Sequence, residues 1–431
     1  MAKKSDQPPA RGKLEKLHHG VSRRPVAAWK LALAVIGPGL VVMLADTDAG
    51  SVITAAQSGA QFGYALLSLQ LILVPILFIV QELTVRLGLV TRKGHGELIS
   101  TRFGRGWAWL SVSTLMLSCV GALLTEFAGI AGVGLLFGVP TWASVLGTVV
   151  FLVVVVASGT YRQVEVVAIL IGLFEMAFVG TAFASKPSLH GMLQAFRNIP
   201  IHNHAFLFLV AGNVGAVIMP WMIFYQQSAV VDKGLQVHHL KAERWDTFGG
   251  ALVTQLIMAA VLILAAATIG QTNAAAPLNT VQQIAHALIP ILGSTWGKVV
   301  FAMGMLGAAL VAAIVVSLTA AWGLGEVTGY KRSLAHHPFE APWFYAVYVV
   351  CLLVGAMTVL SGINLVNLTV AVEVMNALLL PIVLGFLYLL ALKALPDPWR
   401  LRGWYAWLVG FIVVLTSAVG VYAGVVGIFS S

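Results

Sequence analysis

The residues best able to do chemistry are acids that lie inside apolar stretches of the chain. Asp46 and Asp48 stand two positions apart in the run ADTDAGS, residues 45–51. A charged side chain at the centre of a membrane costs roughly 2.5 to 3.5 kcal/mol even on a lenient insertion scale. Such residues persist where they face a water-filled cavity or a bound cation. Asp46 and Asp48 therefore indicate a cation site.

A second apolar stretch contains a break of its own. The run GNVGAVIMPW, residues 212–221, places Pro220 near its middle. Proline has no backbone N–H and clashes with the preceding turn, so it frees carbonyl groups there. Freed carbonyls and carboxylate oxygens together favour a cation over an anion. Asn213 either caps freed backbone groups or lines the site.

The composition shows which elements must position these residues. The chain has 431 residues, of which 59% are hydrophobic and 10% are charged, whereas a soluble protein carries roughly a quarter charged residues. This excludes a soluble enzyme, a nucleic-acid binder and a disordered protein. We expect an all-α integral membrane protein whose partner is the lipid bilayer. No protease-like constellation is present at usable spacing, so we expect neither enzymatic activity nor a cofactor.

Eleven apolar runs are long enough to span a membrane. They cover residues 29–56, 64–90, 107–137, 141–158, 164–184, 205–231, 247–269, 299–322, 343–360, 365–391 and 404–428. Basic residues concentrate in the loops on one side and in a tail, residues 1–28, which predicts a cytoplasmic amino end and an extracellular carboxyl end. We expect the plasma membrane as the location, and no obligatory protein partner is evident.

The interruptions fall in span 1 and span 6, which are corresponding places in two halves of five spans. That pattern is typical of an inverted-repeat transporter whose site lies between the breaks. We expect a single transmembrane domain, residues 29–431, with one repeat at about 29–185 and a second at about 205–392. The remaining span lies at about 404–428.

Four parts of the chain carry recognisable motifs, Asp48–Ser51 with Gln57–Tyr64, Gln81–Thr91, Glu126-Phe127 and Ala216–Pro220. They resemble the NRAMP family of divalent metal transporters, and in particular its prokaryotic magnesium-transporting relatives. The resemblance implies 11 transmembrane helices in the LeuT-type fold, with broken helices 1 and 6 and transport by alternating access. By position, the metal-binding roles of the family fall on Asp48, Ser51, Ala216 and Met219. Asp46, Gly215, Trp221 and Glu373 are further candidates.

The departures from the family pattern bear on which ion is transported and on whether its transport is coupled to protons. Ser51 stands in place of an asparagine ligand, Trp221 replaces a histidine, and Gln226 or Gln227 replaces a second histidine. Tryptophan and glutamine do not titrate near neutrality, so proton coupling is not expected. A wide site rich in acids suits hydrated Mg²⁺, whereas the thioether of Met219 favours softer ions such as Mn²⁺. We place Mg²⁺ first, with Mn²⁺ also carried.

Three alternatives remain open. A conventional family member would import Mn²⁺ or Fe²⁺ with protons. An amino-acid carrier on the same fold would bind its substrate carboxylate at helix N-termini, where Asp46 and Asp48 would repel it. A transport-dead metal sensor would need a long soluble output domain, and the sequence ends at Ser431, shortly after the last span.

Overall fold

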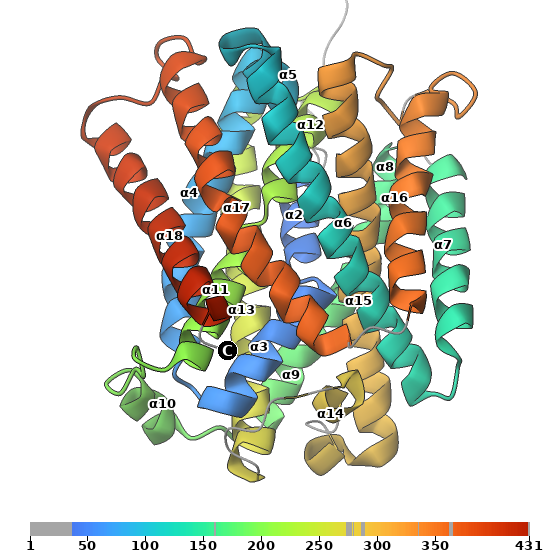
Figure 1. Ribbon diagram of the computed structural model, residues 1–431, viewed down its shortest axis with the longest axis vertical. Helices are drawn as coiled ribbons and strands as arrows, with labels where there is room; N and C mark the ends of the chain where they lie inside the picture. The colour runs from blue at the N-terminus through green and yellow to red at the C-terminus, as the bar shows by residue number, and fades with distance from the viewer. Residues whose placement is uncertain are drawn as a thin grey trace, which may run out of the picture.

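The structure is a computed structural model, and it describes residues 37–429 apart from 159–160, 273–277, 279, 286–288, 335 and 362–364. The expected basic tail, residues 1–28, lies outside the described residues. Within the described residues all regular structure is helical. Figure 1 shows these helices running side by side as one bundle.

The described part of the chain consists of helices joined by short connections. In chain order they are α2 (Pro38–Asp46), α3 (Ala49–Phe62), α4 (Leu67–Thr91), α5 (His95–Phe103), α6 (Arg105–Leu136), α7 (Thr141–Ser158), α8 (Tyr161–Gly172), η2 (Leu173–Glu175), α9 (Met176–Ala184), α10 (Leu189–Ala195), α11 (His204–Val217), α12 (Pro220–Asp232), η3 (Val237–His239), α13 (Leu240–Thr272), α14 (Val281–Ala285), α15 (Ile289–Thr328), α16 (Pro342–Leu360), α17 (Leu365–Lys393) and α18 (Gly403–Phe429).

The helices account for the eleven apolar runs of the sequence. Nine spans in the described part of the chain are long and apolar enough to cross a membrane, and one of them joins α11 to α12. The pair α2 and α3 makes a tenth span, bent by 47° at its break. The shorter apolar helix α7 corresponds to the remaining run. The chain therefore has the length and composition of a multi-pass membrane protein.

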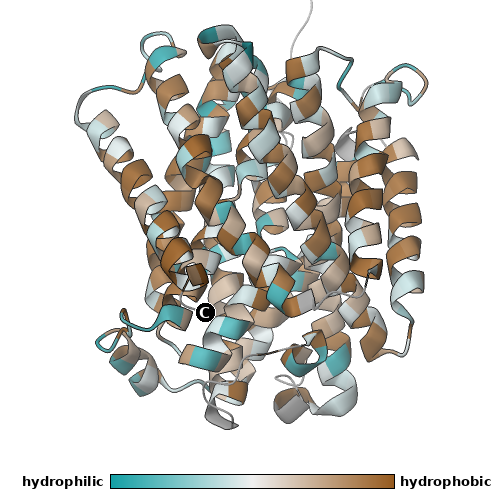
Figure 2. Ribbon diagram, viewed as in Figure 1, coloured by the Kyte–Doolittle hydropathy of each residue, from teal (hydrophilic) through white to brown (hydrophobic). Residues whose placement is uncertain are grey.

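The two broken helices lie at the centre of the bundle. α3 packs on α13, α6 and α11, and α11 packs in turn on α17 and α18. Peripheral helices expose large apolar side chains, as Trp142 on α7 and Phe411 on α18 do. In Figure 2 the outer ribbons are mostly brown, and teal residues appear within the bundle and at its two ends. Polar groups are thus gathered around the breaks.

Ion pairs close the end of the bundle where α5 lies, which we call the basic end. Glu82 on α4 pairs with Arg86 at 2.6 Å and with Arg244 on α13 at 2.8 Å. Lys233, which follows α12, pairs with Glu165 on α8 at 2.9 Å. The short helices α10 and α14 lie at the opposite end (Figure 1). These pairs hold the elements around both broken helices together at the basic end.

Candidate metal site

The first break is built by Thr47 and Asp48. α2 ends at Asp46, and α3 begins at Ala49 with Asp48 as its N-cap. Aspartate is a favoured N-cap because its side chain can accept a hydrogen bond from a free N–H of the first turn. Here Asp48 Oδ1 accepts one from the backbone N–H of Ser51 at 2.7 Å. The cap fixes one carboxylate oxygen at the first break.

The second break is built around Met219 and Pro220. α11 ends at Val217, and α12 begins with Pro220 at its first position. Proline is well tolerated there because the first N–H groups of a helix have no intrahelical partner. Met219, the N-cap of α12, has an extended backbone with φ −90° and ψ 141°. The sequence prediction that Pro220 interrupts span 6 is confirmed.

The two breaks meet through a direct hydrogen bond. The hydroxyl of Ser51 donates to the carbonyl oxygen of Ala216 at 3.0 Å. Ser51, Ala216 and Asp48 are all fully buried. The second oxygen of Asp48, Oδ2, accepts no N–H or hydroxyl hydrogen bond within the described part of the chain, and the carboxyl group of Glu126 lies within hydrogen-bonding reach of Asp48. Three of the four predicted ligands therefore form one connected group.

The fourth predicted ligand, Met219, is already in contact with Trp221. The indole N–H of Trp221 donates to the sulfur of Met219 at 3.1 Å, and both side chains are fully buried. A sulfur is a weak acceptor, so this contact does not prevent it from binding a metal. It does mean that Trp221 and a metal would compete for the same sulfur.

Asp46 and Glu373 add two further buried acids. Neither oxygen of Asp46 has a partner among the described residues, and its side chain is buried. Glu373 on α17 accepts a hydrogen bond from Asn376 at 3.1 Å through Oε2. Its Oε1 lies against the first turn of α3, since a Cβ atom built on Gly50 would be only 2.1 Å from it. Glu373 is thus placed beside the first break.

Gly215 allows two helices to approach closely. A Cβ atom at this position would lie 1.8 Å from the carbonyl oxygen of Glu373 and 2.8 Å from the backbone nitrogen of Ala377. Both atoms belong to α17, and neither can move aside without moving the helix. Gly215 therefore brings α11, which carries Ala216, against the helix that carries Glu373.

Two acids that the sequence left without a role also reach the first break. Glu126 on α6 accepts a hydrogen bond from the backbone N–H of Ala49 at 3.1 Å. Glu175 in η2 accepts a hydrogen bond from the hydroxyl of Thr47. Each acid stands deep within an apolar span, which was the available signal, but the sequence does not reveal the partner. Asn213 donates to the backbone carbonyl of Leu209 at 2.7 Å and to the hydroxyl of Ser58 at 2.8 Å, so it bonds both its own helix and α3.

Buried carboxyl groups dominate the electrostatics of the site. They belong to five buried acids, Asp46, Asp48, Glu126, Glu175 and Glu373. None of the ion pairs found in the described ranges involves any of the five. No three His, Cys, Asp or Glu side chains within those ranges converge into a ready-made metal cage. A bound cation would favour the ionised form of these acids.

The positions where the family carries histidines hold uncharged, bonded side chains. Gln226 donates to Thr247 at 2.9 Å, and Gln227 donates to the carbonyl of Lys93 at 2.9 Å. The oxygen of Gln227 lies 2.9 Å from Nδ1 of His95, so this ring nitrogen carries the proton. Burial lowers the pKa of His95, on the short helix α5, to about 4. His95 is therefore neutral at physiological pH.

Comparison with solved structures agrees with the helical arrangement. A manganese transporter from Eremococcus coleocola superposes with a TM-score of 0.73 at 21% identity, covering 94% of this chain and 89% of that chain. MhsT in complex with L-phenylalanine superposes with a TM-score of 0.58 at 13% identity, covering 91% of this chain and 98% of that chain. These likenesses show the fold, which is the LeuT-type fold expected from the sequence.

Sequence comparison identifies the family. A protein named divalent metal cation transporter MntH, from Staphylococcus aureus strain JH9, is 30% identical over 295 residues, which is 64% of this chain. The match spans 65% of that relative's length. The family model described as natural resistance-associated macrophage protein-like matches residues 39–425, which include both breaks and the group of buried acids. The chain therefore belongs to the Nramp family.

Proposed function

We propose that this protein is a secondary transporter that carries divalent metal cations across the membrane by alternating access. The observation that carries the proposal is the hydrogen bond from Ser51 to the carbonyl of Ala216, beside Asp48, whose Oδ2 accepts no N–H or hydroxyl hydrogen bond within the described ranges. This bond joins the two helix breaks beside buried carboxyl groups. Such a junction between discontinuous helices is where transporters of this architecture hold their ions. Asp48, Ser51, Ala216 and Met219 are the proposed ligands.

The broken helices also provide the segments that would move during transport. Each break divides a span into two shorter helices, so one half can tilt while the other stays packed. At the basic end, α2 is held by Asp246 and α4 is tied to α13 by Glu82 and Arg244. An ion leaving towards that end requires these contacts to separate. The ion would then move as alternate ends of the bundle open.

Mg²⁺ is the proposed preferred ion, with Mn²⁺ as a second substrate. Mg²⁺ is bound through one or two carboxylates and retains several waters. Asp46 and Asp48 together offer three carboxylate oxygens that accept no N–H or hydroxyl hydrogen bond from the described residues. The sulfur of Met219, which would favour softer metals, already accepts a hydrogen bond from Trp221. The available carboxylate oxygens and the occupied sulfur together support a hard cation.

Transport without obligatory proton movement is the second part of the proposal. Trp221, Gln226 and Gln227 cannot exchange protons near neutral pH, and each makes a hydrogen bond within the protein. His95, which contacts Gln227, is held neutral by burial. These side chains therefore make hydrogen bonds within the protein and do not carry protons near neutral pH.

A proton-coupled importer of Mn²⁺ or Fe²⁺ is the second candidate function. Glu126 favours it, because its carboxylate binds the N–H of Ala49 next to Asp48 and could take up a proton when the metal leaves. The acids Asp46 and Asp48 oppose an amino-acid carrier, since they would repel a substrate carboxylate.

The proposed setting is the plasma membrane, with the basic end facing the cytoplasm. Arg92, Lys93 and Arg102 lie around α5 at that end, as the excess of basic residues in cytoplasmic loops predicts. The amino end would then be cytoplasmic and the carboxyl end extracellular. The two halves, residues 29–185 and 205–392, are the proposed inverted repeats.

Uptake into proteoliposomes tests both parts of the proposal. The vesicles would contain a Mg²⁺ dye and, in a parallel sample, a pH dye. We expect saturable Mg²⁺ entry that Mn²⁺ inhibits and Ca²⁺ does not, with no internal acidification. Mn²⁺ entry without Mg²⁺ entry, accompanied by acidification, would contradict the proposal and establish the second candidate.

A further inference from the structure

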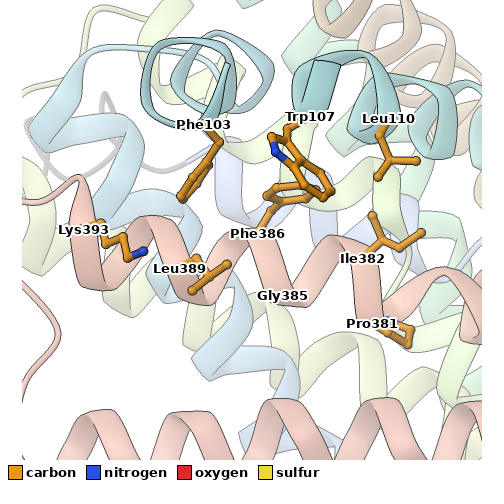
Figure 3. Close-up of a pocket in the computed structure, with 9 residues that line it drawn as sticks. All are labelled: Phe103, Trp107, Leu110, Pro381, Ile382, Gly385, Phe386, Leu389 and Lys393. Atoms are coloured by element: carbon orange, nitrogen blue, oxygen red, sulfur yellow. The ribbon is translucent and has the colours of Figure 1, made fainter. Parts of the chain in front are cut away.

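An apolar groove lies on the membrane-facing side of the bundle, away from the breaks. It has a volume of about 410 Å³ and runs between the start of α6 and the last part of α17. Figure 3 shows Phe103, Trp107 and Leu110 facing the groove from one side, and α17 forming the other side. Both α6 and α17 are long enough and apolar enough to span a membrane. The groove is therefore placed where lipid chains surround the protein.

The floor of the groove is open because α17 carries a small residue there. A Cβ atom on Gly385 would meet no atom within 4 Å. Phe386 fills the inner side, with its ring 5.9 Å from that of Trp107. Trp107 is 55% exposed, which is a large apolar surface to leave without a partner. A chain of methylene groups fits such a surface better than water does.

One end of the groove carries a positive charge. Lys393, the last residue of α17, is exposed, and its Nζ lies 5.9 Å from the centre of the Phe103 ring. None of the ion pairs among the described residues involves Lys393. Arg102 and Arg105 are exposed nearby, at the end of α5 and the start of α6. This end of the groove attracts an anion.

The distance from the apolar end to the charge matches one leaflet of a bilayer. Lys393 lies twelve residues after Pro381 on α17, which is a distance of about 18 Å at 1.5 Å per residue. Half of a hydrocarbon core is about 15 Å thick. A lipid whose acyl chain lay along α17 would thus bring its headgroup phosphate to Lys393.

We propose that this groove binds one anionic glycerophospholipid, with an acyl chain along Gly385 and Phe386 and the phosphate at Lys393. The preference for an anionic headgroup follows from the unpaired lysine, and the preference for a lipid follows from the length and apolar lining of the groove. The site is separate from the proposed metal ligands, although α17 carries Glu373 as well. The inference stands whether or not the transported ion is Mg²⁺.

Native mass spectrometry of the full-length protein in detergent tests this site. The protein would be stripped of lipid and offered palmitoyl-oleoyl phosphatidylglycerol and phosphatidylcholine at equal concentration. We expect the first bound lipid to be mainly phosphatidylglycerol. Lys393→Ala should lower that selectivity roughly fivefold, which corresponds to about 1 kcal/mol of attraction per basic residue near the headgroup. The control Lys331→Ala, another exposed lysine of the basic end, should leave the selectivity unchanged.

A second pair of variants tests the groove itself. Gly385→Phe should block the first lipid of either kind, and Gly385→Leu guards against a folding defect in the larger variant. Gly147→Phe is the control, because Gly147 on α7 also faces open space. Unchanged lipid binding in the two Gly385 variants, or unchanged selectivity in Lys393→Ala, would overturn the proposal. A protein dimer that Gly385→Phe dissociates would overturn it too, since the occupant would be a second copy of the chain.

Discussion

Ser51 supports the first helix break with its backbone and connects it to the second break with its side chain. Its N–H binds Asp48, and its hydroxyl hydrogen goes to Ala216. The hydroxyl oxygen still has lone pairs that can face a cation, because the hydrogen alone is used. A longer amide side chain at this position would reach further towards the ion. Serine therefore leaves more room between the breaks, which suits an ion that keeps part of its water.

Replacing Met219 by leucine should affect the uptake of hard and soft metal ions differently. The change keeps the volume of the side chain and removes the only thioether among the proposed ligands. We expect Mg²⁺ uptake within about twofold of the wild type and a clearly weaker Mn²⁺ uptake, since only the softer ion gains from sulfur. Met222→Leu, at a buried methionine on the same helix, is the matched control. Equal loss of both ions in Met219→Leu would argue that the sulfur has only a packing role.

His95 gives the folded state a defined response to acid. Its pKa is about 4 in the folded protein and about 6.5 when unfolded, so the unfolded chain binds more protons between these values. Its contribution to stability is complete above pH 6.5 and decreases by roughly 3 kcal/mol as the pH falls to 4.

The variant His95→Asn keeps a donor for Gln227 and removes the titration. Melting temperatures measured from pH 7 to pH 4 should fall less steeply in His95→Asn than in the wild type. His190→Asn, at an exposed histidine, should keep the wild-type slope. An identical slope in all three proteins would show that His95 does not govern the response to acid.

At the scale of elements, the start of α2 depends on a side chain from α13. The carboxylate of Asp246 accepts hydrogen bonds from the backbone N–H groups of Gly37, Gly39 and Leu40, at 3.2, 2.9 and 3.2 Å. A negative charge at a helix N-terminus is stabilising because the free N–H groups there carry partial positive charge. Asp246 thus holds the first half of the broken span in place at the basic end.

Asp246→Ala should lower the free energy of unfolding by about 2 kcal/mol, because several N–H groups lose their shared acceptor. Thermal unfolding in detergent measures the change. Glu340→Ala is the comparison, since Glu340 is 61% exposed and its pair with His336 should contribute less than about 1 kcal/mol. A loss in Asp246→Ala no larger than in Glu340→Ala would contradict a capping role.

The approach of α11 to α17 depends on Gly215. Gly215→Ala should cost at least about 2 kcal/mol, because the added methyl group meets backbone atoms of α17 that cannot turn aside. At Gly212, one turn earlier, the nearest atom to an added Cβ is a methyl carbon of Thr54 at 3.2 Å. Gly212→Ala should therefore be milder in both melting temperature and metal uptake. Equal effects of the two changes would contradict the claim that α11 can approach α17 only with a glycine at position 215.

At the scale of the whole molecule, the sequence predicts most of the fold. Long apolar runs predict spans because a bilayer leaves few alternatives to a helix of about 20 residues. Asp48 and Pro220 predict the two breaks because neither residue suits the interior of a continuous membrane helix. The structure contains both breaks at these residues.

The contacts around the breaks could not be predicted in the same way. Glu126, Glu175 and Glu373 come from three different spans, and their partners are fixed by how those spans pack. The rotation of each helix about its axis and its depth in the membrane depend on many small packing interactions. The hydrophobic periodicity of the sequence does not reveal them. The contact of Trp221 with Met219 is local, yet it depends on the extended backbone of Met219 at the break. The sequence thus predicts which residues are unusual, and packing determines what they touch.

The most direct test of the proposed site is Mg²⁺ uptake by Asp48→Asn in proteoliposomes. This change keeps an oxygen to accept the N–H of Ser51 and removes the charge that would hold the ion. Glu340→Gln, at an exposed acid outside the bundle centre, serves as the control, and melting temperatures verify that both variants fold. We expect wild-type uptake in the control and uptake reduced at least 100-fold in Asp48→Asn, because losing a charged partner at a buried site costs on the order of 3 kcal/mol. Wild-type Mg²⁺ uptake by a folded Asp48→Asn protein would contradict a cation site between the two helix breaks.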